Sequence, residues 1–417
     1  MKQTVHPAKV SGNLFAPPSK SHAQRAIILS SLARGRSVIS NPGDNDDVRA
    51  AIEIGRAFGA LVVRAGNKLE ICGCQIPAST VYNCRESGFL SRAFTPVLAS
   101  FPNSFEVTGK GSLLKRDQLI LIESLAAFGV HCQGHDGMLP IKIKGPFEKF
   151  SASINGAQGS QVLSGLLMAA PLTNQPVNLW VNDLKSKKYV DLTIDIMRHF
   201  GVNVEQNDYE HFFVHGNQEY LAASINIEGD WSAASFLLVA GAVAGNVNIA
   251  NLNPDSYQPD KAIVDLLQMV GADIEISGDK ISASKNKLKP FRFDATNCPD
   301  LFPPLVALAA NCNGTSTIKG VGRLANKESD RATALIDVFE SMGVEITAAG
   351  NEMVIMGGGK IRGCEVHSHN DHRIAMAAAV AALNASGPIT ISGSEAVAKS
   401  YPEFFEHLVA LGTGHIA

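Results

Sequence analysis

The sequence predicts an α/β protein of two domains, each built from three βαβαββ units with buried helices and outer sheets. Three observations support this fold class. The length of 417 residues exceeds that of a single ordinary core, so two domains are expected. A glycine that closes an amphipathic helix recurs about every 70 residues along the chain. An Ala- and Leu-rich helix followed by an alternating strand recurs with the same period.

The recurring glycines mark where each surface helix ends and a strand begins. Glycine suits the left-handed conformation after a helix end, which explains the residue type. The glycines are Gly59, Gly129, Gly201, Gly271, Gly343 and Gly412. Strands are expected soon after them, at 61–63, 202–204, 274–276 and 344–346, and a second short strand follows in five units, as at 68–71 and 352–356.

The recurring Ala- and Leu-rich helices predict the inner layer of each domain. Helices that are apolar on all faces should be buried, whereas the flanking amphipathic helices should lie at the surface. The inner helices are expected to include 29–33, 97–100, 166–172, 237–244, 305–310 and 375–383. Strands are expected directly after them, at 37–39, 104–107, 177–179, 247–249, 316–318 and 389–391.

Composition narrows the functional class. A formal net charge of −3 argues against a nucleic-acid binder, which usually carries a strongly basic face. The seven cysteines are odd in number and scattered, so we expect reduced thiols and a cytoplasmic location. Residues 1–6 contain no apolar signal core, and no run of about 18 apolar residues occurs, so we expect a soluble protein with no membrane segment.

The stretch 17–25 is the first candidate site. Ser19 is expected to cap a helix that begins at Lys20, and Ser21 and Arg25 then share one face of it. Two cations near a helix start oppose the helix dipole, so an anion is expected there, held by backbone N–H groups, Lys20 and Arg25. The alternative is a solvated basic helix start.

Further cations interrupt the apolar pattern at corresponding helix starts or loops of other units. If the units pack as pseudo-symmetric copies, these ends can converge on a cleft between the domains that suits two anionic small molecules. Asp300 and Glu328 are its acid/base candidates, although an acid at a helix start is more often a cap. The cations are Lys20, Arg25, Arg92, Arg116, Lys327, Arg331, Arg373 and Lys399.

A metal centre is not expected. His367, His369 and His372 imitate a ligand cluster, but no matching carboxylate arrangement accompanies them in the sequence.

These polar stretches together resemble the 5-enolpyruvylshikimate-3-phosphate synthase family, in that family's order from residue 18 to 402. The matching segments are 18–21 with Arg25, Ser160-Gln161, Ser186-Lys187 with Tyr189, 327–331, 370–373 and 398–402. The resemblance implies an inside-out α/β barrel in each domain. It also implies one domain from 1–17 plus 228–417 on the phosphoenolpyruvate side, another from 18–227 on the shikimate 3-phosphate side, and an active site in the cleft between them.

The resemblance also implies a reaction and its residues. The enolpyruvyl group of phosphoenolpyruvate is transferred to the 5-hydroxyl of shikimate 3-phosphate by addition and elimination through a tetrahedral intermediate, a step of chorismate and aromatic amino acid biosynthesis. Catalysis would fall to Asp300, Glu328 and Lys20. Shikimate 3-phosphate would be held by Lys20, Ser21, Arg25, Ser160, Ser186, Asp300 and Lys327. Phosphoenolpyruvate would be held by Lys20, Gly88, Arg116, Gln161, Arg331, Arg373 and Lys399. No cofactor is expected, the domains should close over the substrates, and the protein should be a monomer.

One segment departs from the family pattern. Glu86 and Phe89 flank Gly88 where the family usually has asparagine and threonine, which affects the expected affinity and inhibitor response of the phosphoenolpyruvate pocket. A non-catalytic anion-binding homologue is therefore one alternative. A second alternative is a UDP-sugar enolpyruvyl transferase, which should have a cysteine in the loop 110–115, and this loop has none. A third is a nucleic-acid-end cyclase, which should have a more basic surface.

Overall fold

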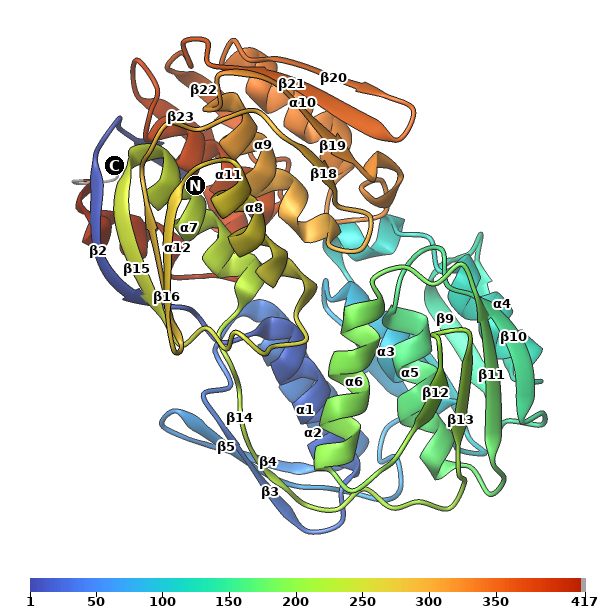
Figure 1. Cartoon of the computed structure of the whole chain (residues 1–417). Helices are drawn as coiled ribbons and strands as arrows, with labels where there is room; N and C mark the ends of the chain where they lie inside the picture. Colours follow the sequence, from blue (N-terminus) through green and yellow to red (C-terminus); the bar gives the residue numbers. More distant parts are fainter. Residues whose placement is uncertain (414–417) are drawn as a thin grey trace. The chain divides into compact units, whose positions relative to one another are not determined.

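The computed structural model describes residues 1–413, which form two compact units. Unit 1 comprises Met1–Pro17 and the chain from Glu228 onward, and unit 2 comprises Pro18–Ile227. In each unit the sheets lie on the outside and helices fill the interior (Figure 1). This is the inside-out arrangement of helices and sheets that the periodicity predicts.

Unit 2 alternates inner and outer helices along the chain. The inner helices are α1 (Lys20–Leu32), α3 (Gly88–Leu98) and α5 (Gln161–Ala169), and the outer ones are α2 (Asp46–Phe58), α4 (Leu119–Ala127) and α6 (Lys187–His199). Short 3-10 turns are η1 (Gly111–Lys115) and η2 (Ala170–Leu172). The strands are β3 (Arg36–Ser40), β4 (Leu61–Ala65), β5 (Lys68–Cys72), β6 (Val81–Asn83), β7 (Ser104–Thr108), β8 (His131–His135), β9 (Met138–Lys144), β10 (Ser151–Asn155), β11 (Val177–Asn182), β12 (Glu205–Asn207), β13 (His211–Val214) and β14 (Ser224–Asn226).

Unit 1 repeats the plan. Its inner helices are α7 (Trp231–Ala244), α9 (Phe302–Ala310) and α11 (His372–Ala382), and its outer ones are α8 (Ile263–Met269), α10 (Arg331–Ser341) and α12 (Phe404–Leu408). Short turns are η3 (Pro259–Ala262), η4 (Pro299–Leu301), η5 (Val321–Arg323), η6 (Ser394–Lys399) and the π-type η7 (Val409–Thr413). The strands are β1 (Lys2–Val5), β2 (Val10–Phe15), β15 (Gly245–Ala250), β16 (Asp273–Ser277), β17 (Lys280–Ser284), β18 (Arg292–Asp294), β19 (Gly314–Lys319), β20 (Glu345–Ala349), β21 (Glu352–Gly357), β22 (Cys364–His367) and β23 (Ile389–Ser392).

The sheets show the βαβαββ repeat directly. In the sheet ordered β6-β7-β9-β8, β6 and β7 are parallel partners joined through α3, β9 adds antiparallel to β7, and β8 adds antiparallel to β9. Among the described residues the same order recurs in β10-β11-β13-β12 and β18-β19-β21-β20. This confirms the predicted repeat.

Strands distant in sequence complete the sheets of the remaining repeats. β14, at the end of unit 2, pairs parallel to β3 near its start. β2 pairs parallel to β15, and β1 adds antiparallel to β23 in the sheet β1-β23-β22. Each unit therefore fastens its own first and last segments together.

The recurring glycines occupy the left-handed conformation that their positions predict. Their φ angles are 116° at Gly59, 77° at Gly129, 84° at Gly201, 95° at Gly271, 78° at Gly343 and 101° at Gly412. One strand expected after them is misplaced: β12 begins at Glu205, so the prediction of a strand at 202–204 is wrong. The reason is that the backbone N–H of Val202 closes the preceding helix on the carbonyl of Met197, and Asn203 bonds the side chain of Gln218.

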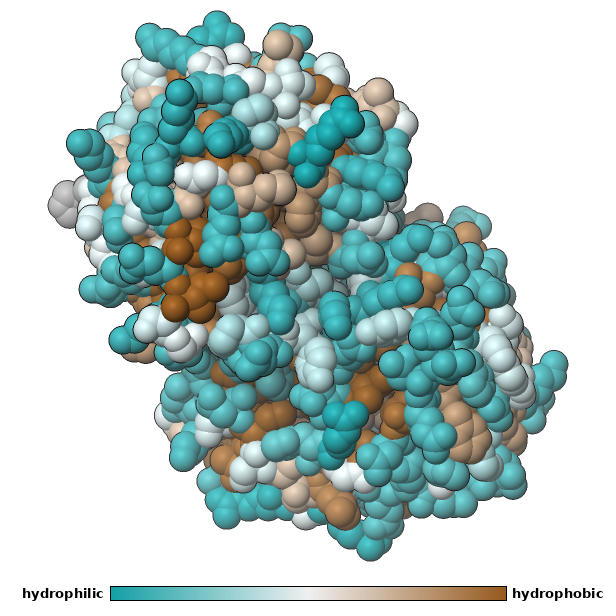
Figure 2. Space-filling view, viewed as in Figure 1, coloured by the Kyte–Doolittle hydropathy of each residue, from teal (hydrophilic) through white to brown (hydrophobic). Residues whose placement is uncertain are grey.

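The inner helices are mostly apolar beyond their polar first turns, because nearly all of their residues are buried. All residues of α7 and α11 are buried, whereas α2 and α6 keep an exposed polar face. The face in view in Figure 2 is mostly hydrophilic, with separate hydrophobic patches. Within residues 1–413, no helix is both long and apolar enough to cross a membrane.

The left-handed glycines give a test of the repeat. Gly271→Ala should lower the free energy of unfolding by about 1–2 kcal/mol, because φ is 95° and the added Cβ would lie 3.1 Å from the carbonyl oxygen of Lys287. Gly359→Ala is the control, since nothing lies within 4 Å of its Cβ position. Urea unfolding measures both, and equal midpoints for the two variants would contradict this explanation of the recurring glycine.

Candidate active site

Charged side chains gather in the interior of unit 1, around the start of its inner helices. We call this set the unit 1 charge cluster; its members are Asp300, Lys327, Glu328, Arg331, Asp371, Arg373 and Lys399. Asp300 lies in the turn η4 before α9, Arg331 begins α10, and Asp371 caps α11. The sequence therefore folds so that three helix starts supply one cluster, two from the repeat that contains α9 and α10 and one from the repeat that follows it.

Arg331 is the centre of this cluster. Only 1% of its side chain is exposed, and it donates hydrogen bonds to three carboxylates. Nε donates to Asp371 (2.8 Å), Nη1 to Asp300 (2.7 Å) and Nη2 to Glu328 (2.6 Å). A buried guanidinium needs such partners, because an unpaired buried charge is costly.

Asp300 is shared by several cations rather than serving as a helix cap. Besides Arg331, it accepts from Lys327 at 3.3 Å and from Nη2 of Arg373 at 3.2 Å. Burial alone would raise its pKa, but the positive charges of Arg373, Lys327 and Arg331 outweigh burial and hold the pKa of Asp300 well below its usual range. The carboxylate is therefore ionised in this arrangement.

Burial and the neighbouring charges also shift the pKa values of the cations in this cluster. Burial is the largest influence on Lys327 and lowers its pKa to about 8, although Asp300 opposes this shift. Burial would lower the pKa of Arg331 as well, but Asp371, Glu328 and Asp300 raise it above its ordinary value. Lys399 lies 3.8 Å from Glu328, so that carboxylate has a cation on either side.

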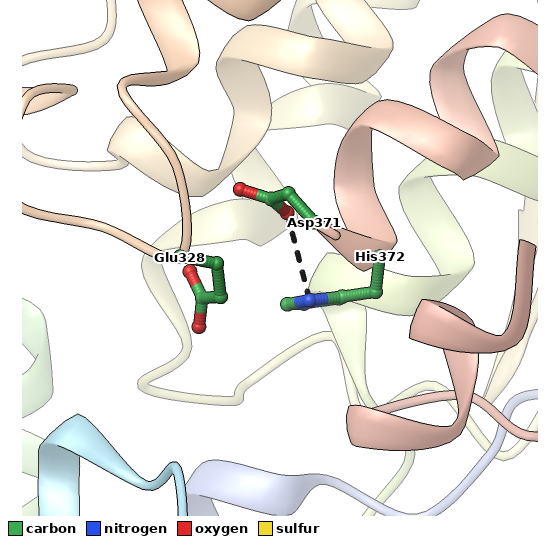
Figure 3. A group of neighbouring side chains, drawn as sticks. All are labelled: Glu328, Asp371 and His372. Atoms are coloured by element: carbon green, nitrogen blue, oxygen red, sulfur yellow. Dashed lines mark ion pairs between the residues drawn. The ribbon is translucent and has the colours of Figure 1, made fainter. Parts of the chain in front are cut away.

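Within the described residues, Glu328, Asp371 and His372 lie close enough to offer ligand atoms to one ion (Figure 3). The dashed line joins Nδ1 of His372 to Asp371 at 3.6 Å. Both carboxylates already accept hydrogen bonds from Arg331. A metal ion here would compete with that guanidinium and with nearby Lys399, so the donor set suits a cation-lined anion site better than a metal centre.

In unit 2 the helix α1 begins as expected. Ser19 caps it by accepting from the N–H of His22, and Lys20 is its first residue. Nζ of Lys20 lies 3.0 Å from Asp47, a buried acid of the first turn of α2. Lys20, the first of the two cations near this helix start, is thus paired with a carboxylate that the pattern did not indicate.

Arg25 points inward, into unit 2. Its side chain donates to the hydroxyl of Thr193 (2.8 Å) and to the carbonyl of Ser21 (2.8 Å), and its guanidinium lies 4.3 Å from the ring centre of Phe89. Only 2% of Arg25 is exposed, and burial lowers its pKa to about 10. Phe89, one of the departures from the family pattern, therefore stacks on a predicted binding residue.

Arg116 and Gly88 are close neighbours in unit 2. A Cβ on Gly88 would lie 2.8 Å from Nη1 of Arg116, so a side chain at this position would displace the end of the guanidinium. Nη2 of Arg116 donates to Ser112 (3.0 Å), whose hydroxyl donates to Glu86 (3.1 Å). The unusual Glu86 is therefore linked to Arg116 through one hydroxyl group.

The remaining predicted residues of unit 2 lie at helix starts. Ser160 and Ser186 are the N-cap residues of α5 and α6, and neither side chain caps its helix. Both residues are buried, and Ser186 has a left-handed φ of 57°. The side-chain oxygen of Gln161 accepts from Arg92 at 2.9 Å, so Arg92 orients a predicted binding residue.

The structure therefore brings the predicted residues of unit 1 together in one cluster, and it places those of unit 2 at the starts of α1, α3, α5 and α6 and in the segment after η1. Sequence reasoning left Asp371 and Asp47 out of the predicted site. Asp371 carries a sequence signal, since it immediately precedes a buried helix; Asp47 carries none beyond its place in a helix start. The i, i+4 spacing of Lys327 and Arg331 does not act through a helix, because α10 begins only at Arg331.

The sequence is similar to a known protein family over nearly its whole length. A family model described as EPSP synthase (3-phosphoshikimate 1-carboxyvinyltransferase) matches residues 5–408. A protein of Methanocorpusculum labreanum named 3-phosphoshikimate 1-carboxyvinyltransferase is 35% identical over 417 residues, covering 99% of each chain. A protein of the same name from Clostridium kluyveri is 35% identical over 416 residues, covering 98% of this chain and 97% of the relative.

Solved structures agree with this match. An EPSP synthase from Acinetobacter baumannii has a TM-score of 0.82 and 25% sequence identity, covering 100% of this chain and 99% of the other. The enolpyruvyl transferase NikO from Streptomyces tendae has a TM-score of 0.78 at 18% identity, covering 99% and 97%, and shares the fold.

The central arginine gives a stability test. Arg331→Met should lower the free energy of unfolding by about 3–5 kcal/mol, because three carboxylates would lose their shared buried partner. Lys319→Met is the control, since Lys319 pairs with Asp294 at the surface and both side chains are 53% exposed; its effect should stay within about 1 kcal/mol. Chemical unfolding compares the two, and equal losses would show that the cluster does not stabilise unit 1.

Proposed function

The chain belongs to the EPSP synthase family, and from this membership we propose how its own residues carry out the reaction. It transfers the enolpyruvyl group of phosphoenolpyruvate to the 5-hydroxyl of shikimate 3-phosphate, a transferase step of aromatic biosynthesis. The unit 1 charge cluster is the observation that supports the residue roles best. The family match favours neither a non-catalytic homologue nor a UDP-sugar enolpyruvyl transferase.

We assign the phosphoenolpyruvate anion in unit 1 to Arg331, Arg373 and Lys399. All three cations are largely buried, and each lies beside a carboxylate of the same cluster. Arginine binds carboxylate and phosphate groups in two-pronged fashion, which fixes the orientation of the substrate as well as its position. Lys327 and Asp300 are assigned to shikimate 3-phosphate.

Asp300 is the proposed acceptor of the proton from the 5-hydroxyl. Three cations now hold its pKa low, which makes the carboxylate a weak base. When a substrate anion draws Arg331 and Arg373 toward itself, Asp300 loses part of this stabilisation and becomes more basic. The same binding event would therefore place the substrate and activate the base.

Glu328 is the proposed partner in proton transfer at the enolpyruvyl carbons. Addition of the hydroxyl requires that the methylene carbon gain a proton, and elimination of phosphate requires that the new methyl group lose one. Glu328 lies between Arg331 and Lys399, so it can exchange a proton beside the bound anion while nearby positive charge stabilises its ionised form. Lys20 is assigned to both substrates and to catalysis.

Unit 2 supplies the other proposed contacts. Ser21, Arg25, Ser160 and Ser186 are assigned to shikimate 3-phosphate, and Gly88, Arg116 and Gln161 to phosphoenolpyruvate. The position of Gly88 against Arg116 supports the last assignment, because a side chain at residue 88 would displace the guanidinium from its present position.

We further propose that the unit 1 charge cluster and the predicted site residues of unit 2 act on one pair of substrates in the active enzyme, with the residues of 1–17 and 228–417 serving one side and those of 18–227 the other. Closure of the two domains would exclude water and complete the set of charges. Preorganised charge and orientation then supply most of the rate enhancement, and the residues in place need no cofactor for this chemistry.

The cellular setting is part of the same proposal. We propose a cytoplasmic monomer that acts on small molecules and binds neither nucleic acid nor a membrane. Its seven cysteines are all free, as a reducing compartment favours. The net charge of −3 gives no general attraction to nucleic acid.

The proposed base is tested by Asp300→Asn. The variant keeps the size of the side chain but removes the proton acceptor, so kcat should fall by about 100- to 10,000-fold. Phosphate release from phosphoenolpyruvate in the presence of shikimate 3-phosphate measures it, with circular dichroism to confirm folding. Asp294→Asn, which removes a surface carboxylate of the same unit, should keep wild-type turnover; an active Asp300→Asn enzyme would remove Asp300 from the mechanism.

The role of unit 2 in binding phosphoenolpyruvate is tested by Arg116→Lys. Loss of the two-pronged contact should raise KM for phosphoenolpyruvate about tenfold to a hundredfold and leave KM for shikimate 3-phosphate nearly unchanged. Arg198→Lys, on the exposed face of α6, is the matched control. Unchanged KM values for both substrates would exclude Arg116 from the site.

A further inference from the structure

Asp260 is a buried acid of unit 1 that no step above uses. It lies in the turn η3, and none of its surface is exposed. Oδ2 accepts a hydrogen bond from the hydroxyl of Ser232. Oδ1 is buried and accepts no hydrogen bond from the residues that the structure describes. A carboxylate with an unsatisfied buried oxygen is costly when it is ionised, and less so when it carries a proton.

The charges around Asp260 connect it to the unit 1 charge cluster. Helix α7 presents Ser232 and the carboxylate of Asp230, and η4 with its preceding residue presents Asp300 and the Cys298 thiol. Helix α11 presents Arg373, the positive charge that acts on Asp260. The remaining helix packed on this turn, α8, buries only apolar side chains.

Arg373 is in a complementary position. Its Nη1 and Nη2 donate to the carbonyl and the carboxylate of Asp300, at 3.3 and 3.2 Å. Its Nε is buried and, among the described residues, donates to no acceptor. Arg373 is thus held by Asp300 and attracted by Asp260 without a hydrogen bond between them.

These opposing effects bring the pKa of Asp260 close to neutral pH. Burial, followed by the negative charge of Asp300, raises the pKa of Asp260 to about 7, while Arg373 and Ser232 act in the opposite direction. A ligand that changes the charge at Arg373 will therefore change the protonation of Asp260.

We propose that Asp260 is a positioning residue for Arg373 that takes up one proton from solvent when the phosphoenolpyruvate anion binds there. The inference rests on the role proposed for Arg373 above. The incoming anion neutralises the cation that keeps Asp260 ionised and brings a second negative charge close to it. Protonation of Asp260 removes this repulsion and leaves the residue neutral.

Because binding takes up a proton, phosphoenolpyruvate should bind more weakly as the pH rises. Below pH 7 Asp260 already carries its proton, and binding is unaffected. Above pH 7 the free enzyme must first take up a proton, so KM for phosphoenolpyruvate should rise by up to about tenfold for each pH unit.

The test compares KM and kcat for phosphoenolpyruvate between pH 6 and 9 in wild type and Asp260→Asn. Asparagine resembles the protonated acid, so the variant should match wild type at pH 6 and have a KM about 30-fold lower at pH 8.5. Its kcat should stay within about threefold of wild type. Lys327 also titrates near pH 8, but it is present in both enzymes, so the ratio of the two KM values isolates Asp260.

Two further variants keep the test decisive if Asp260→Asn fails to fold. Ser232→Ala removes a hydrogen bond that favours the ionised acid, so the rise in KM should begin at higher pH than in wild type. Asp265→Asn, which removes an exposed carboxylate on α8, should leave the pH profile unchanged.

The outcomes separate this inference from the proposed function. A KM ratio that is the same at every pH, or an unshifted profile for Ser232→Ala, would show that Asp260 has only a structural role. Wild-type enzyme that releases no phosphate from phosphoenolpyruvate at any pH would overturn the proposed function and this inference with it.

Discussion

The hydrogen bonds from Arg331 to Asp300, Glu328 and Asp371 hold the interior of unit 1 together at the place where it is most polar. A guanidinium that is 1% exposed is costly to bury unless its N–H groups find partners. Here the partners are carboxylates, which in turn need the cation. This mutual dependence fixes three segments from two successive repeats relative to one another. It also means that the residues proposed to bind substrate anions are paired internally before any substrate arrives, so binding exchanges one set of partners for another.

The repeat explains how such a cluster can form. Each unit places apolar helices inside and strands outside, and left-handed glycines such as Gly343 turn the outer helices back into the sheets. The inner helices then begin within reach of one another, and Asp300 and Arg373 meet at 3.2 Å although they belong to different repeats. The same inner helices therefore serve the site and the fold. Their starts carry the charged residues, and the apolar remainder of each helix fills the core.

The fold was largely predictable from the sequence, because glycine conformation and Ala- and Leu-rich periodicity are local signals. The error at 202–204 arose where the helix closure through Val202 used backbone that the pattern assigned to a strand. Residue types of the site were also predictable from their motifs. Asp47 and Asp260 were not, because their importance lies in interactions with Lys20 and Arg373, which are distant in sequence. Asp371 carried the signal of preceding a buried helix, but its pairing with Arg331 was not predictable.

The account rests on substrate anions replacing the internal partners of the buried arginines. These partners are carboxylates in unit 1 and hydroxyl or carbonyl oxygens in unit 2. A crystal structure of the enzyme with shikimate 3-phosphate and an unreactive phosphoenolpyruvate analogue tests this most directly. We expect the analogue to accept hydrogen bonds from Arg116 of unit 2 and from Arg331 and Arg373 of unit 1, with longer distances from Arg331 and Arg373 to Asp300. An analogue bound by one unit alone, with the pairs around Asp300 unchanged, would contradict the account.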